Sequence, residues 1–105
     1  MSAVNFAVGL EQDDGVATLR LSGELDIAVI ERLREVRDRA LADGPASLVI
    51  DLSEVEFIDS SGLKFLLESD RLLRPSACEL SLRRPGPAAM KVFSITGVDQ
   101  HLPFA

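Results

Sequence analysis

Apolar and polar residues alternate along the first part of the chain. Four apolar residues recur at every second position near its start, namely Val4, Phe6, Val8 and Leu10. This period is typical of a half-buried β-strand. The pair Asp14-Gly15 follows and favours a tight turn, because glycine accepts positive φ. The alternation resumes over residues 16–22, so the sequence predicts an opening β-hairpin.

The spacing then changes to that of amphipathic helices in three segments. The first, over residues 27–42, carries apolar residues on one face, and Asp26 stands where its carboxylate caps a helix. A second helix follows the serine pair and ends at Arg74-Pro75, because the residue before a proline disfavours helical backbone. A short third helix covers residues 88–94 and is broken at Thr96-Gly97.

Short apolar runs between these helices predict further strands, at residues 47–52, 79–82 and 101–104. Strands that alternate with helices favour parallel crossovers. We therefore predict an α/β fold with a mixed, mostly parallel sheet of about five strands. An N-terminal hairpin opens this sheet, and the helices pack against it. With 105 residues, the chain forms one domain over residues 1–105.

Charge and composition narrow the classes of function. The net charge of −6 argues against a nucleic-acid or anionic membrane surface, because both need a basic footprint. It suits a basic protein partner, but it also fits plain solubility. No apolar run is long enough to span a bilayer and no signal peptide opens the chain, so we expect a cytoplasmic protein. We expect a monomer, because no large exposed apolar stripe stands out in the sequence. Cys78 lacks a partner for a disulfide or metal site, and we expect a buried structural thiol. No metal or cofactor is predicted.

The segment Asp59-Ser60-Ser61-Gly62 is the candidate functional site. It lies between a predicted strand and a helix, at the end of the sheet where α/β proteins gather their sites. A structural interpretation makes Ser60 or Ser61 the helix N-cap and Gly62 a tight-packing residue. Catalysis by a serine with His101 as base is disfavoured by the absence of a Gly-x-Ser-x-Gly elbow. A phospho-aspartate receiver with Asp51 as acceptor would need an acidic pair after its first strand, and the pair Asp13-Asp14 is better explained as a hairpin turn.

Three further motifs stand in the chain: Gly23-Glu24-Leu25-Asp26, the run from Asp51 to Leu63 that contains Asp-Ser-Ser-Gly-Leu, and Val92 to Val98. Together they resemble the STAS domain family, and are most similar to its bacterial anti-sigma factor antagonists. The resemblance covers nearly the whole chain in the family's order. Many members carry a further helix after the last strand, and this sequence ends at Ala105, so contacts by such a helix stay open.

The resemblance implies a partner-switching function without catalysis. Ser60 occupies the position that receives a phosphate. The unphosphorylated antagonist binds an anti-sigma factor, often an ATP-dependent serine kinase, and frees a sigma factor. Phosphorylation ends this binding and a serine phosphatase restores it. The alternative within the fold is an accessory subunit of a transporter or of a stress-signalling assembly.

Residues near the serine are the expected partner contacts: Asp26, Asp59, Ser60, Ser61, Gly62, Leu63 and Phe65. Asp26 and Asp59 also fit simple roles as helix cap and turn former. Phe65 lies off the apolar helix face, so it is either an exposed anchor for a partner or buried against another element. Arg83 and Arg84 end the next strand, either as a solvated pair or pointing to the rim of Ser60.

Overall fold

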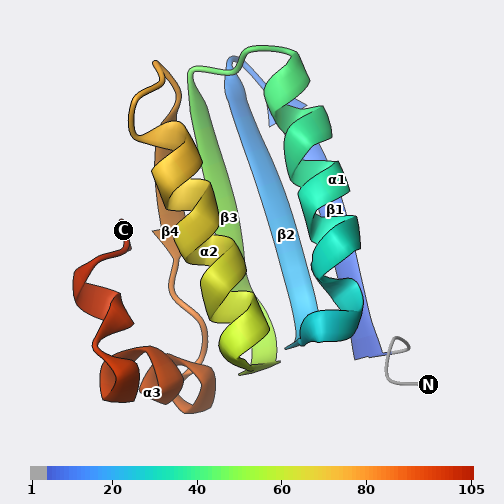
Figure 1. The fold of residues 1–105 in the computed structure, drawn as a ribbon. Coiled ribbons are helices and arrows are strands. Elements are labelled where there is room, and N and C mark those ends of the chain that lie inside the picture. The colour runs from blue at the N-terminus through green and yellow to red at the C-terminus, as the bar shows by residue number, and fades with distance from the viewer. Residues whose placement is uncertain (1–4) are drawn as a thin grey trace.

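One mixed sheet organises the protein. The computed structural model describes residues 5–105, and Val4, expected in the first strand, lies outside them. The sheet has the order β1-β2-β3-β4 (Figure 1). β1 (Phe6–Asp13) pairs with β2 (Val16–Leu25) in antiparallel fashion, and β3 (Ser47–Ile58) and β4 (Glu79–Arg83) continue the sheet in parallel. The predicted hairpin and the mostly parallel sheet are confirmed.

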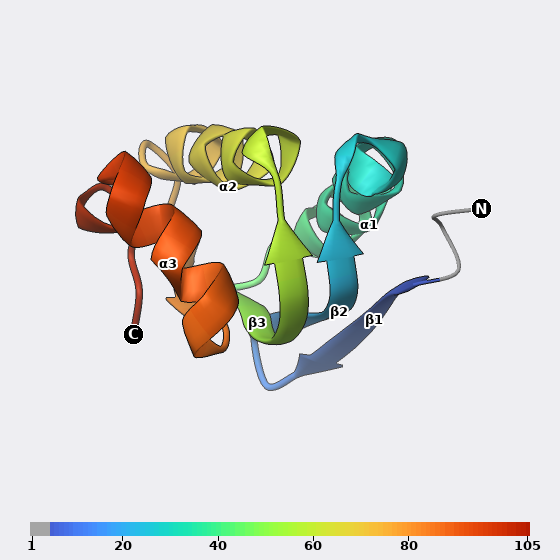
Figure 2. The same cartoon turned by 90° about the horizontal axis from the view of Figure 1, so that it is seen from below.

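The helices follow the predicted order. A short 3-10 turn, η2 (Ile27–Val29), leads into α1 (Ile30–Ala42), and α2 (Ser60–Leu73) follows β3. α3 (Pro87–Thr96) and a second 3-10 turn, η3 (Val98–Gln100), come after β4. Viewed from below, α1 and α2 lie side by side over one face of the sheet, while α3 lies toward its β3–β4 side (Figure 2). Both long helices begin at the end where β2 and β3 finish.

The core lies between the sheet and the helices. Alternate residues of β2 and β3 point inward and pack against α1 and α2. Those with no exposed surface in the two strands are Ala17, Leu19, Leu25, Leu48, Ile50 and Leu52. This two-layer packing confirms the α/β class and leaves the helix N-termini at one rim of the sheet.

The prediction of a last strand over residues 101–104 is wrong. Residues 101–104 form only a single bridge, in which Phe104 pairs with Leu82. The Leu82 amide donates to the Pro103 carbonyl at 2.9 Å, and the Ala105 amide donates to the Leu82 carbonyl at 2.9 Å. A proline has no amide hydrogen, so Pro103 cannot extend the ladder. The described part of the chain therefore has four strands rather than about five.

β3 is longer than the sequence predicts, because it runs from Ser47 to Ile58 rather than ending at Leu52. Two irregularities in its pairing with β2 interrupt the alternation of buried and exposed residues. Its inward residues are Leu48, Ile50, Leu52, Val55 and Ile58. Their spacing lengthens from two to three residues after Leu52, since a bulge inserts an extra residue into one strand.

Candidate functional site

Ser60 is the first residue of α2 and is exposed at the rim of the sheet. The helix cap is Asp59, whose Oδ1 accepts hydrogen bonds from the Ser61 amide at 2.8 Å and the Gly62 amide at 3.2 Å. The structural interpretation of Ser60 or Ser61 as the N-cap is therefore wrong. Because a carboxylate caps the helix, the Ser60 hydroxyl is not needed for this role.

Asp26 occupies the matching position on the neighbouring turn. Its Oδ1 accepts a hydrogen bond from the Ala28 amide at 3.0 Å and caps η2, which confirms its predicted role as a cap. The two turns are joined directly, since the Asp59 amide donates to the Leu25 carbonyl at 3.2 Å. The carboxylates of Asp26 and Asp59 thus stand on adjacent turns of the same rim.

Gly62 allows α2 to approach the sheet closely. A Cβ atom at this position would lie 2.5 Å from Ile58 Cγ1 and 3.1 Å from the Leu25 carbonyl oxygen. Both distances are shorter than ordinary van der Waals contact, so any side chain would move the first turn of α2. The expectation of tight packing at Gly62 is confirmed, and Leu63 beside it is 7% exposed.

Phe65 is fully buried. The interpretation of Phe65 as an exposed anchor for a partner is therefore wrong, and the alternative of burial against another element is confirmed. α2 packs against both the sheet and α1, and this widens its buried side beyond the Leu63 and Leu66 face. The guanidinium of Arg37 lies over the Phe65 ring at 5.3 Å from its centre. A partner cannot reach this ring without disrupting the core.

Two exposed apolar residues at the rim were missed. Ile27, directly after Asp26, is 75% exposed, and Phe57 is 49% exposed. The Cα partner of Phe57 is Glu24, one step before the final pair of Leu25 with Ile58. The signal was present in the sequence, because Phe57 directly precedes the buried Ile58 and neighbouring strand residues face opposite sides.

Carboxylates stand near the ends of β2 and β3. Besides Asp26 and Asp59 on the two turns, Glu24 in β2 and Glu56 in β3 lie close to the strand ends, and Glu54 lies further back along β3. Glu54 and Glu56 are exposed, and Glu24 is half-buried. The rim therefore presents apolar side chains among carboxylates, an arrangement that suits a basic protein surface.

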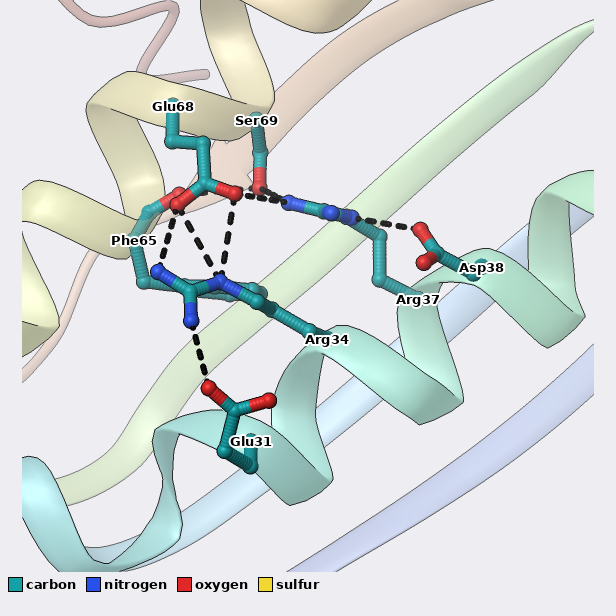
Figure 3. Close-up of polar contacts among 7 residues, drawn as sticks. All are labelled: Glu31, Arg34, Arg37, Asp38, Phe65, Glu68 and Ser69. Atoms are coloured by element: carbon teal, nitrogen blue, oxygen red, sulfur yellow. Dashed lines mark hydrogen bonds and ion pairs between the residues drawn. The ribbon is translucent and has the colours of Figure 1, made fainter.

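A polar seam holds α1 and α2 together, as Figure 3 shows. Arg37 is only 5% exposed, and its Nη1 donates to the Ser69 hydroxyl at 2.9 Å. Arg34 binds Glu68 at 3.0 Å and Glu31 at 2.8 Å. The hydrogen bond from Arg34 lowers the pKa of Glu68, against the opposing effect of burial. The seam fixes the spacing of the two helices that begin at the rim.

Arg83 does not reach the rim of Ser60. It is the Cα partner of Asp51, and its Nη1 lies 3.8 Å from Asp51 Oδ2. β4 ends at this level while β3 continues to Ile58, so the two strands do not finish together. Arg84 lies instead over the Phe104 ring, at 5.1 Å from its centre.

Residues 5–105 hold no cluster of three or more His, Cys, Asp or Glu side chains suited to a metal ion. Within the same range, every helix is too short or too polar to cross a membrane. Cys78 is half-buried rather than buried, and burial raises the pKa of its thiol.

The fold and the rim match one family. The family model described as Mlab, STAS domain matches residues 8–103. The chain therefore belongs to the STAS domain family, as its motifs predicted.

Within that family, several of the similar proteins are anti-sigma factor antagonists. The anti-sigma-F factor antagonist RsfB of Mycobacterium tuberculosis is 32% identical over 96 residues, which are 91% of this chain and 78% of that protein. An anti-sigma F factor antagonist of Paenibacillus polymyxa is 28% identical over 101 residues, covering 95% of this chain and 86% of that protein.

Solved structures agree. An anti-sigma factor antagonist from Mycobacterium paratuberculosis superposes with a TM-score of 0.83 at 34% identity, covering 94% of this chain and 84% of that one. The antagonist SpoIIAA in its unphosphorylated form gives a TM-score of 0.77 at 30% identity, over 94% of this chain and 88% of that one. The phosphorylated form of SpoIIAA gives a TM-score of 0.70.

Proposed function

We propose that this protein is an anti-sigma factor antagonist that is switched by phosphorylation at Ser60. In its unphosphorylated form it binds an anti-sigma factor, and this binding releases a sigma factor. The observation that carries the proposal is an exposed serine hydroxyl at the start of α2, left free of capping by Asp59. The names of the similar proteins support it.

A phosphate on Ser60 would act on the interface more than on the fold. It adds a charge of roughly −1.5 to −2 beside Asp59 and near Asp26. The N-terminus of α2 partly favours this charge, by about 0.3–1 kcal/mol. Acidic groups of a partner that face Ser60 are repelled by this charge, and this repulsion opposes binding. Even against a basic partner surface, a contact shaped for the small hydroxyl does not accommodate the larger, strongly hydrated phosphate.

The contact surface comprises the exposed part of the rim. Asp26, Asp59, Ser60 and Ser61 supply its polar groups, while Gly62 and Leu63 shape it from beneath. Ile27 and Phe57 take the role of apolar anchors that Phe65 cannot fill. Exposed aromatic and aliphatic side chains at the centre of an interface often carry most of its binding energy.

The partner is an anti-sigma factor of the ATP-dependent kinase type, and a serine phosphatase restores the active form. The protein acts in the cytoplasm as a monomer, without a reaction of its own and without direct contact to nucleic acid. The net charge of −6 supports a protein partner with a basic surface.

The test is a pull-down from lysate of the native cell, with wild type and Ser60→Asp as baits. Ala46→Asp serves as control, because it adds the same charge at an exposed residue before β3, at the opposite end of the sheet. We expect wild type and Ala46→Asp to recover a kinase-type anti-sigma factor, and Ser60→Asp to lose it. Equal recovery by all three baits would refute the switch. A membrane transporter in place of the anti-sigma factor would favour an accessory subunit.

A further inference from the structure

β3 is held differently along its length. From Ser47 to Asp51 it pairs with β2 on one side and β4 on the other. Asp51 is the last residue with partners on both sides, Arg20 in β2 and Arg83 in β4. Beyond it, the part of β3 that leads to the Ser60 turn is paired with β2 alone.

A bulge begins at this boundary. After the pair of Arg20 with Asp51, the next pair joins Ser22 to Glu54, so β3 has one residue more than β2 over this step. A bulge removes the ladder partner of a backbone group and turns the strand that follows. The direction of the strand end therefore depends on how this step is held.

The side-chain carboxylate of Asp51 stabilises this bulge. Oδ1 accepts a hydrogen bond from the Ser53 amide at 2.9 Å, within the bulged step. The residue is only 8% exposed, so its charge needs compensation. Arg83 at 3.8 Å and Arg20 on the facing strand supply it. Asp51 thus satisfies a backbone group that the ladder leaves free and is itself fixed from two sides.

The bulge contributes to which residues face the core near the rim. After it Val55 points inward, at 4% exposure, and a second irregularity follows between Val55 and Phe57, after which Phe57 points away and Ile58 points inward at 2% exposure. Gly62 packs against the side chain of Ile58. The orientation of Ile58 therefore determines where the first turn of α2 lies on the sheet. A chain of contacts therefore leads from the bulge through Ile58 and Gly62 to Ser60.

We propose that Asp51 is a positioning residue for the Ser60 turn. Its carboxylate fixes the bulge, and the bulge aims the strand end that carries Phe57 and Asp59. Asp51 lies roughly 25 Å along the strand from Asp59, at about 3.3 Å per residue, so it acts through β3 and not by contact. The proposal rests on the proposed function only because that function makes the Ser60 turn the partner-binding surface.

Amide hydrogen exchange on the protein alone tests the proposal. The variants are Asp51→Ala, which removes the acceptor, and Asp51→Asn, which keeps an acceptor oxygen. Glu11→Gln is the control, because Glu11 pairs with Arg20 at 3.3 Å on the same face but lies in β1, whose pairing with β2 is regular throughout. We expect Asp51→Ala to speed exchange at Ser53 and at residues 57–62 by about tenfold or more. Asp51→Asn should restore part of the protection, and Glu11→Gln should match wild type.

The pattern of exchange separates positioning from general stability. A rise confined to residues 52–62, with β1 and the first half of β2 unchanged, supports the proposal. A uniform rise over the sheet, no rise at residues 57–62, or the same rise in Glu11→Gln would overturn it. Since no partner takes part, these outcomes are independent of whether Ser60 is the switch.

Discussion

Replacing Gly62 with alanine tests how closely α2 must approach the sheet. The new Cβ would meet Ile58 Cγ1 at 2.5 Å and the Leu25 carbonyl oxygen at 3.1 Å, so the first contact is short by about 1 Å. Gly62 lies in a helix, and the backbone itself accepts alanine without strain. The effect therefore isolates packing.

Two opposing contributions set its size. Alanine favours a helix over glycine by about 1 kcal/mol. Overpacking a core site typically costs about 1–3 kcal/mol. Because Cγ1 of Ile58 is not the free end of its side chain and the second contact is backbone, we expect the upper part of this range. The net loss of unfolding free energy is then about 1–2 kcal/mol, a fall in melting temperature of roughly 4–8 °C or more.

Urea denaturation of wild type and Gly62→Ala measures this loss. Gly9→Ala is the matched control, because nothing lies within 4 Å of its new Cβ in the middle of β1. The control should be neutral or stabilising by about 0.4–1 kcal/mol. If Gly62→Ala gains stability as the control does, the close-packing argument is wrong. The variant should also bind the anti-sigma factor more weakly, since the Ser60 turn must move.

Three further predictions concern exposure and charge. Phe57→Ala should weaken binding of the anti-sigma factor about tenfold or more with little change in melting temperature, because Phe57 is exposed. Phe65→Ala should instead lower the free energy of unfolding, measured by denaturation, by about 3–5 kcal/mol, because Phe65 is buried. The reverse pattern would contradict the assignment of Phe57 to the binding surface and Phe65 to the core. The pKa values of Asp51 and Glu68 are lowered in the folded state, so the free energy of unfolding should be at its full value above about pH 5 and fall below that pH. The fall should be less steep in Glu68→Gln. Identical curves of stability against pH for wild type and this variant would rule out a contribution of Glu68 to the acid sensitivity. Burial raises the pKa of Cys78, so iodoacetamide at pH 8 should alkylate it more slowly than a model thiol, and an equal rate would disagree.

The regular parts of the fold could be predicted from the sequence because their periods are uninterrupted. Alternation in β1 and β2 and the helical spacing of α1 and α2 each follow a single repeat. The second half of β3 could not be predicted in this way. Its bulges insert residues at Ser53 and Glu56, and an inserted residue destroys the period of two by which a strand is identified.

The sequence predicted the backbone features of the candidate site better than it predicted which side chains are exposed there. The position of Ser60, the cap at Asp26 and the tight packing of Gly62 depend on local sequence. The burial of Phe65 depends on α1, which brings Arg37 over the ring from a distant part of the chain. Such a contact between two helices leaves no periodic signal in either of them.

The most direct test of the switch is the affinity of the recovered anti-sigma factor for this protein with and without a phosphate on Ser60, measured by calorimetry on the purified proteins. The phosphorylated form should bind at least about a hundredfold more weakly, because like charges in an interface cost several kcal/mol. Its melting temperature should stay close to that of the unmodified protein. Equal affinity of the two forms, or unfolding of the phosphorylated one, would contradict a switch at the interface.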